Sequence, residues 1–233
     1  MLAVFKKEMR SYFTSFIGYI VLAVFFAIAS VLFSTVCLIS KCATLQPVFN
    51  PLFLIVSIIT PILTMRLLSD EKRCKTDQLL FTSPVKLSSV VFGKYLASLV
   101  MYLICMLIFL VYALIISSLG AYPGWGSLFG SLLGAFLLGA TFLSVGIFFS
   151  SITENQIIAA ICGILTFIVF SLVDSLVKNV SFLYKIVNSI SFMNHYENFV
   201  NGIINFSDCI FFLSVSALFL YLTIHILERK RWR

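Results

Sequence analysis

The chain has little charge and few residues of the kinds that do chemistry. Only 11% of its 233 residues are charged, it has 2 His, and 61% of it is apolar. A water-soluble domain is about one-quarter charged, so this balance excludes a soluble protein. It also excludes a disordered chain, because disordered segments are poor in aromatic residues and this chain has 25 Phe. The composition predicts a protein whose solvent is lipid.

Motifs for catalysis and metal binding are also missing. The sequence has no His-Glu-x-x-His, no Gly-x-Ser-x-Gly and no Cys/His grouping with zinc spacing. Gly93-Lys94 is like the end of a P-loop, but Ser88 stands at the first Gly position and Tyr95 at the Ser/Thr position. We therefore expect no enzyme activity, and no catalytic, metal-binding or cofactor-binding residues, in this chain.

Long uncharged stretches are what the sequence has in quantity. About 20 apolar residues in a helix cross the roughly 30 Å hydrocarbon core, and continuous apolar runs indicate helices rather than a barrel. Gly120, Pro123, Gly124 and Gly126 divide the longest stretch into a hairpin. The sequence predicts one all-α polytopic membrane domain, 1–233, with six transmembrane helices at about 16–39, 43–65, 95–119, 127–151, 155–173 and 209–227.

The basic residues divide unevenly between the two sides of these spans. With the N-terminus inside, all of the 16 Lys and Arg except Lys41, Lys178 and Lys185 fall on the inner side. Lys and Arg collect on the cytoplasmic side of membrane proteins, so both termini are predicted to be cytoplasmic. The same bias accounts for the net charge of +7, and no nucleic-acid partner is expected.

The N-terminal residues show a helical pattern of their own. Lys6, Arg10 and Thr14 fall on one side, and apolar residues recur on the other at Leu2, Phe5, Met9, Tyr12, Phe13 and Phe16. This pattern predicts an interfacial amphipathic helix on the inner leaflet. The alternative is a tail with chance periodicity.

The inner loop 66–94 combines both signs of charge with apolar residues, a mixture that suits a protein partner. The residues expected to contact that partner are Asp70, Glu71, Arg73, Lys75, Thr76, Leu79, Leu80, Phe81 and Pro84. The three consecutive apolar residues supply anchors, whereas exposed charges such as Lys72 are expected to matter less. The alternative is a solvated loop whose apolar residues dip into the bilayer.

The outer loop 174–208 has two apolar stripes at helical spacing, which predict two short helices before the sixth span. Asn194 with Glu197 three residues on resembles a capping box for the second of them. We expect these helices to form a lid over the exit path, with His195, Glu197, Phe199 and Ile203 as its residues. The alternative is a plain interfacial loop.

The fourth span carries glycines at four-residue spacing, Gly126, Gly130 and Gly134. Such a ridge of small residues lets a second helix approach closely. Packing within the subunit and packing between subunits both fit this pattern.

Several segments resemble the gliding-motility-type permeases of type-2 ABC exporters. The matching stretches are residues 6–15 (KKEMRSYFTS), 61–67 (PILTMRL), 82–85 (TSPV) with Gly93-Lys94, 195–199 (HYENF) with Gly202, and the tail 228–233 (ERKRWR). The resemblance implies a dimer, with this chain as permease beside a second permease half, either a copy of itself or a different chain. It also implies separate ABC ATPase subunits that hold ATP and Mg²⁺.

The same resemblance implies a role for the inner loop and a location for the protein. Loop 66–94 would carry the coupling helix that docks on the ATPase, although Lys75 stands at a usual Gly and Gln78 at a usual acid. The location implied is a bacterial cytoplasmic membrane, crossed outward by substrate.

Two other functions fit the composition: a self-contained secondary carrier or channel, and a membrane scaffold that does not transport. Coupled carriers usually need buried Asp, Glu or His on the pathway. No charge lies near the centre of a predicted span, so ATP-driven export is the preferred hypothesis.

Overall fold

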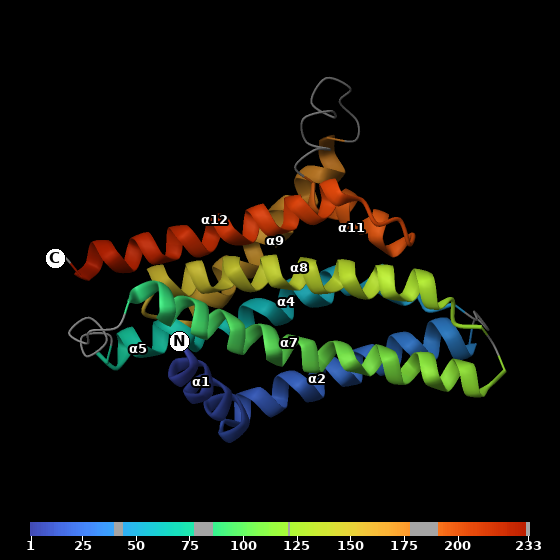
Figure 1. Cartoon of the computed structure of the whole chain (residues 1–233), viewed down its shortest axis with the longest axis horizontal. Coiled ribbons are helices and arrows are strands. Elements are labelled where there is room, and N and C mark those ends of the chain that lie inside the picture. Colours follow the sequence, from blue (N-terminus) through green and yellow to red (C-terminus); the bar gives the residue numbers. More distant parts are fainter. Residues whose placement is uncertain (40–43, 77–85, 121, 178–190, 232–233) are drawn as a thin grey trace.

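The computed structural model describes residues 1–39, 44–76, 86–120, 122–177 and 191–231. Throughout these ranges the regular elements are helices, and no strand is present (Figure 1). A helix satisfies its backbone N–H and C=O groups within its own segment, as lipid requires. The all-α prediction is confirmed.

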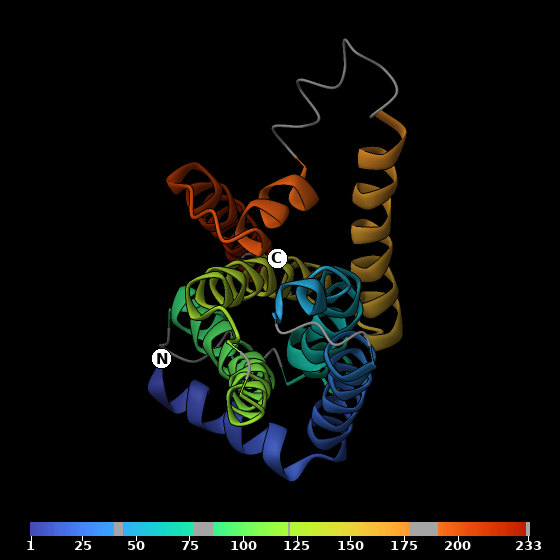
Figure 2. The same ribbon diagram turned by 90° about the vertical axis from the view of Figure 1, so that its right-hand side faces the viewer.

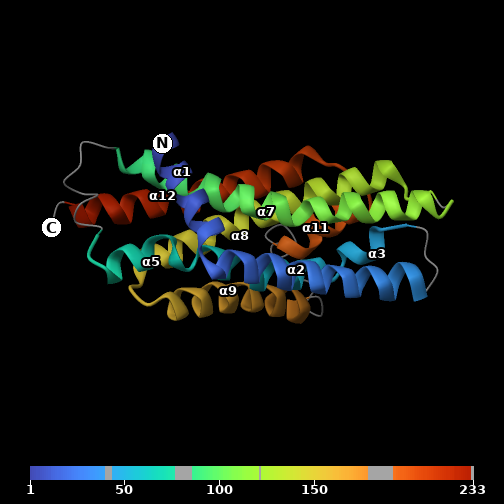
Figure 3. The ribbon, with the colours of Figure 1, turned by 90° about the horizontal axis from the view of Figure 1, so that it is seen from below.

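The helices follow one another in a simple order. They are α1 (Leu2–Thr14), α2 (Phe16–Phe33) continued by the π-helical η1 (Ser34–Ile39), α3 (Gln46–Phe49), α4 (Leu52–Thr64), α5 (Arg66–Arg73), α7 (Leu87–Ser118), α8 (Trp125–Ile152), α9 (Gln156–Val177), α11 (Phe192–Val200) and α12 (Phe206–Arg231). The longest run side by side along the long axis of the molecule (Figures 1 and 3).

Within the described part of the chain, five helical stretches are long and apolar enough to cross a membrane. They are Phe16–Ile39, Leu52–Arg73, Leu87–Ser118, Trp125–Ile152 and Phe206–Arg231. The apolar stretch of α9, Gln156–Leu172, is shorter. The sixth span therefore stays a prediction.

The second and third spans differ most from the sequence prediction. The sequence predicts the second at 43–65, but its helix covers Leu52–Arg73 and includes the charged residues of α5. The third begins at Leu87 and not at residue 95. The sequence prediction places the end of each span at the first charged residue. This rule fails here because the charges of Glu71 and Lys94 are paired inside the bundle. Both ends of the predicted loop 66–94 are thus helical.

α8 is the centre of the bundle, with α12, α4, α11, α9 and α7 packed against it. Gly139 leaves room for the ring of Tyr102, which fills the space that a side chain there would take. Farther along, Phe142 stacks on Phe167 of α9 with ring centroids 3.7 Å apart. Contacts of this kind let α8 hold its neighbours close.

α7 and α8 are joined by a turn where glycine and proline predict a hairpin. Gly120 and Gly124 have φ angles of 80° and 69°, in the left-handed region that glycine adopts without steric cost. Gly124 is also the N-cap of α8. The chain can therefore reverse direction within a few residues.

The two ends of the bundle have different contents. α1, α5, the first turns of α7 and the last turns of α12 gather at one end, which we call the basic end (Figure 3). α3 and the turn between α7 and α8 lie toward the opposite end, with α11 beside them. Seen down the long axis, α1 and α2 run along one side of the bundle and α12 lies on the other (Figure 2).

Candidate functional site

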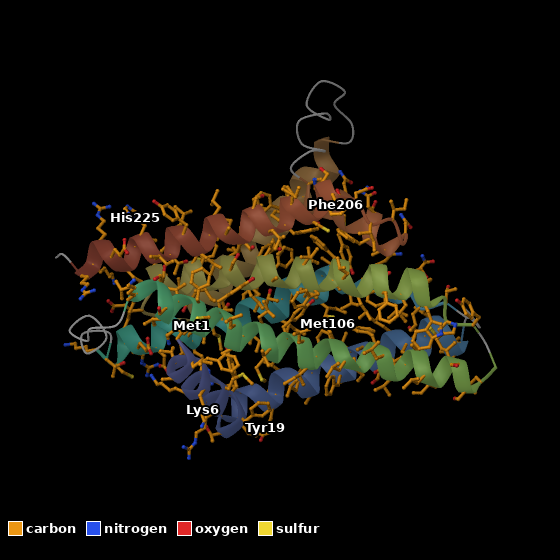
Figure 4. The ribbon with its side chains drawn as sticks, viewed as in Figure 1. Met1, Lys6, Tyr19, Met106, Phe206 and His225 are labelled. Atoms are coloured by element: carbon orange, nitrogen blue, oxygen red, sulfur yellow. The ribbon has the colours of Figure 1, made fainter. Side chains whose placement is uncertain are left out.

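α1 lies across the basic end and packs on α7. Its buried residues are Glu8 and Tyr12, whereas Leu2 and Phe13 are exposed. Lys6 points away from the bundle (Figure 4). α1 thus turns a carboxylate and a phenol toward the protein and leaves part of its apolar stripe uncovered.

Glu8 pairs with an amine buried beneath α1. The Nζ of Lys94, on α7, lies 2.8 Å from Glu8 Oε1 and 2.9 Å from Glu71 Oε1 on α5. It also donates to the carbonyl oxygen of Leu67 at 2.6 Å. The Lys94 side chain is 1% exposed, and a buried charge is stable only when it is paired and hydrogen-bonded. Glu8, Glu71 and Lys94 join three helices, and we call them the ionic latch.

A second set of contacts holds the other end of α1. The Arg66 guanidinium donates to Ser15 Oγ at 2.6 Å and to Ser11 Oγ at 3.1 Å. It also lies 5.0 Å from the centroid of the Tyr12 ring, a cation–π contact. Tyr12 donates its hydroxyl to Leu63 O at 2.8 Å, and burial raises the pKa of Tyr12 above its ordinary value. The phenol therefore remains a donor, and α1 stays bound to the junction of α4 and α5.

α5 is also held by α8 and α9. Ser150 Oγ, on α8, accepts hydrogen bonds from the backbone N–H groups of Leu68 and Ser69 at 3.1 and 3.0 Å. Gln156, the first residue of α9, donates to Asp70 Oδ1 at 2.7 Å. A displacement of α5 must therefore be shared by α1, α7, α8 and α9.

At the opposite end, α11 is tied to the start of α12 through Asp208. His195 Nδ1 lies 2.6 Å from Asp208 Oδ1, and Asn198 and Asn205 donate to Oδ2 at 3.0 and 3.3 Å. Tyr196 donates its hydroxyl to the last carbonyl of α3 at 2.8 Å, and burial raises the pKa of this phenol. α11 is thus fixed on both of its sides.

Comparison with known proteins decides which class of membrane protein this is. The family model for the ABC-2 family transporter protein matches residues 32–230, most of the chain. The chain belongs to the ABC-2 transporter family. No curated protein matches the sequence. The resemblance seen in the sequence is confirmed: this is a multi-pass membrane permease of an ABC transporter and not itself the ATPase.

The predicted coupling residues of the permease differ in burial. Asp70 and Glu71 are partly buried and engaged with α9 and the ionic latch. Lys72 is buried at 6% exposure, so the expectation of an exposed charge is wrong. Lys72 follows Leu68 by four residues and shares its buried face. The exposed residues are Arg73, Lys75 and Thr76, whereas Leu79, Leu80, Phe81 and Pro84 lie outside the described residues.

Lys75 ends α5 in an unusual conformation. Its φ is 56°, a left-handed value that Gly adopts more readily than Lys. The N–H groups of Lys75 and Thr76 donate to the carbonyls of Lys72 and Glu71 at 3.0 and 2.9 Å. These two bonds form a Schellman motif, whose left-handed residue is usually Gly. The backbone at Lys75 thus favours glycine, the residue that the resemblance implies for this position.

The glycine ridge of the permease packs within the subunit over part of its length. Phe199 of α11 is fully buried and occupies the space that a side chain at Gly134 would take. A Cβ at Gly130 would lie 3.3 Å from Gly202 Cα. Gly126 has open space around it among the described residues, so it takes no part in this contact.

The predicted outer lid needs two corrections. α11 begins after Ser191, whose Oγ accepts from Asn194 N at 3.2 Å, so Ser191 and not Asn194 is the N-cap. α11 ends at Val200, and Ile203 lies beyond it with 55% exposure. The helical stripe therefore does not continue to Ile203, because the chain turns after Val200. Glu197 is on the helix and partly buried.

Sequence reasoning missed the ionic latch because it places Lys94 in a loop. One signal was available. Lys94 follows Leu87 by seven residues, which is two helical turns, and so shares a face with it. Glu8 is also the one acid in the basic segment 2–14, and it needs a cation once that helix packs on the bundle.

Proposed function

We propose that this permease is one membrane-spanning subunit of an ATP-driven exporter in a bacterial cytoplasmic membrane, with both termini in the cytoplasm. A second permease half and separate ATPase subunits that hold ATP and Mg²⁺ complete the transporter. The gathering of Lys and Arg at the end that carries α1 and the last turns of α12 supports this orientation. The substrate would be a lipid-like, peptide or saccharide molecule.

The proposal rests mainly on the contacts that hold α5 to its neighbouring helices. The last residues of α5 are exposed at the basic end, while its other contacts reach four helices. A push from an ATPase on the segment after α5 would pass through the ionic latch to α1 and α7. It would pass through Ser150 and Gln156 to α8 and α9. Packed helices transmit such displacements because dense interiors resist compression.

α1 would lie on the inner leaflet in this arrangement. Leu2 and Phe13 are 82% and 40% exposed, and Lys6 and Arg10 are exposed as well. A basic helix with uncovered apolar residues is suited to the boundary between headgroups and acyl chains. Through the latch, α1 would move with α5 in the plane of the membrane.

Removal of the apolar anchors after α5 tests docking. Leu79→Ala/Phe81→Ala should weaken copurification of the ATPase by a factor of tens or more, because central anchors typically cost about 2 kcal/mol each and about 1.4 kcal/mol is tenfold. The matched control is Ile203→Ala/Ile204→Ala, an exposed pair at the opposite end. If the first variant retains the ATPase as well as the control does, and hydrolysis stays coupled to transport, this segment is not the coupling element.

A variant of the latch tests transmission separately from docking. Glu71→Gln leaves the exposed end of α5 unchanged but removes one carboxylate from Lys94. We expect the ATPase to be retained while its hydrolysis loses coupling to transport in proteoliposomes. Normal transport by Glu71→Gln would show that the latch does not transmit the displacement of α5 to the other helices.

A further inference from the structure

A cavity opens at the basic end between the start of α7 and the end of α12. Its volume is about 550 Å³, and it is lined by Lys86, Leu87, Ser88, Glu228 and Arg231. α7 and α12 are in contact, and the two ends lie near each other in Figures 1 and 3. Sites for small ligands are typically about 300–1,000 Å³, so the space is sufficient for a polar headgroup.

The charges around this cavity favour an anion. Among the residues that the structure describes, Lys86 and Arg231 supply two cations against the single carboxylate of Glu228, and Ser88 adds a hydroxyl. The first turn of α7 borders the cavity, and among the described residues no side chain caps it. The first N–H groups of a helix lack intrahelical acceptors and carry a partial positive charge. The two cations and the N-terminus of α7 therefore all favour the binding of an anion in this cavity.

The surroundings of the cavity indicate which anion. Phe92 follows Ser88 by one helical turn on α7 and is 41% exposed. On α12, Tyr221 precedes Glu228 by two turns and is 68% exposed. Residues at these spacings share a helix face, so exposed aromatic side chains continue from the cavity along both helices toward the membrane. A soluble anion would not contact these exposed aromatic side chains, whereas the acyl chains of a lipid would pack against them.

A second cavity lies on the other side of the end of α12. Its volume is about 360 Å³, and its lining combines two cations with apolar residues: Ser151, Ile152, Ile226, Arg229 and Lys230. The consecutive basic residues of α12 thus line cavities on both sides of the helix. This placement suits a helix end embedded among headgroups.

We propose that the cavity between α7 and α12 binds the phosphate headgroup of an anionic phospholipid. Lys86 and Arg231 contact the phosphate, and the acyl chains follow Phe92 and Tyr221 toward the bilayer centre. Basic pockets between membrane helices on the cytoplasmic side bind such headgroups. The site requires that the basic end face the leaflet rich in anionic lipid, and it does not depend on ATPase coupling.

The test is lipid binding by the purified full-length permease, measured by native mass spectrometry. Dioleoyl phosphatidylglycerol and dioleoyl phosphatidylcholine are added in separate titrations to wild type, Lys86→Ala/Arg231→Ala and Lys6→Ala/Arg10→Ala. The last variant loses the same charge from exposed residues of α1 at the same end. We expect wild type and control to prefer phosphatidylglycerol, and the cavity variant to bind it about thirtyfold more weakly. Lys86 and Arg231 are exposed, and equal melting temperatures verify folding.

Three outcomes would overturn the proposal. One is equal retention of phosphatidylglycerol by all three proteins. Another is displacement of the lipid by millimolar inorganic phosphate, which would assign the cavity to a soluble phosphate compound. The third is loss of the bound lipid when the ATPase is added, which would show that protein covers the cavity. The lipid titrations need no ATPase, so a negative result there leaves the proposed function unaffected.

Discussion

Lys94 is a buried cation whose two carboxylate partners come from distant parts of the chain. Lys94→Ala would leave Glu8 and Glu71 close together without their buried cation, and only the exposed Lys7, 3.3 Å from Glu71 Oε1, would remain beside them. Breaking a buried ion pair by removing one partner costs about 3–5 kcal/mol, so we expect a clearly lower melting temperature in detergent micelles. Lys6→Ala, which removes an exposed charge from α1, should melt like wild type.

The latch also predicts a rescue. Lys94→Met combined with Glu8→Gln and Glu71→Gln removes all three charges of the latch at once, and replacing a buried ionic group as a whole is often nearly neutral. Most of the lost stability should return. A single Lys94→Ala protein that melts with wild type would show that the three side chains do not form the latch.

At Lys75 the strain lies in the backbone. The residue has a φ of 56°, and a left-handed conformation costs an L-residue roughly 1–2 kcal/mol relative to Gly. Lys75→Gly should therefore raise stability by up to about 1 kcal/mol, read as an increase in melting temperature. Lys75→Ala keeps the Cβ and should give little increase. Equal gains from both variants would assign the effect to the lost charge.

Between elements, the contact that α11 makes with α8 at Gly134 can be tested with two glycines of the same ridge. Gly134→Ala puts a methyl group where Phe199 lies, and overpacking of this kind costs about 1–3 kcal/mol. A methyl group at Gly126 meets open space among the described residues, so Gly126→Ala should stabilise α8 by up to about 1 kcal/mol, since Ala is the better helix former. Thermal unfolding of the two variants should therefore shift in opposite directions.

A second substitution checks the cause at Gly134. Gly134→Ala/Phe199→Ala removes the ring that the new methyl group meets, so the double variant should lose less than the sum of its two single changes. Additive losses would mean that α11 does not rest on Gly134.

How far an element can be predicted depends on what ends it. α8 was predictable at 127–151 and spans Trp125–Ile152, because lipid sets the length of an uncharged run. α5 was not, because its charges pair with residues of other helices. The latch contact between Lys94 and Glu8, 86 residues apart, depends on how helices pack across the bundle. Local spacing does not contain that information.

For the whole molecule, the orientation across the membrane gives a labelling prediction. Cys74 is exposed at the end of α5, and Asn201 is exposed just after α11. In single-cysteine proteins in intact cells, an impermeant maleimide should label Asn201→Cys and not Cys74, because Lys and Arg gather on the cytoplasmic side. Permeabilised cells, in which both should react, are the control. Labelling of Cys74 in intact cells would reverse the proposed orientation.

The ionic latch also sets an order on biosynthesis. Glu8 lies 86 residues before Lys94, and at about 5–20 residues per second the ribosome needs about 4–17 s to make the intervening chain. During that interval α1 has a carboxylate but no buried amine to receive it, so it must stay where water reaches Glu8, at the membrane surface. α1 is therefore synthesised before α5 and α7, but it cannot form its buried ion pair with Lys94 until the third span has emerged.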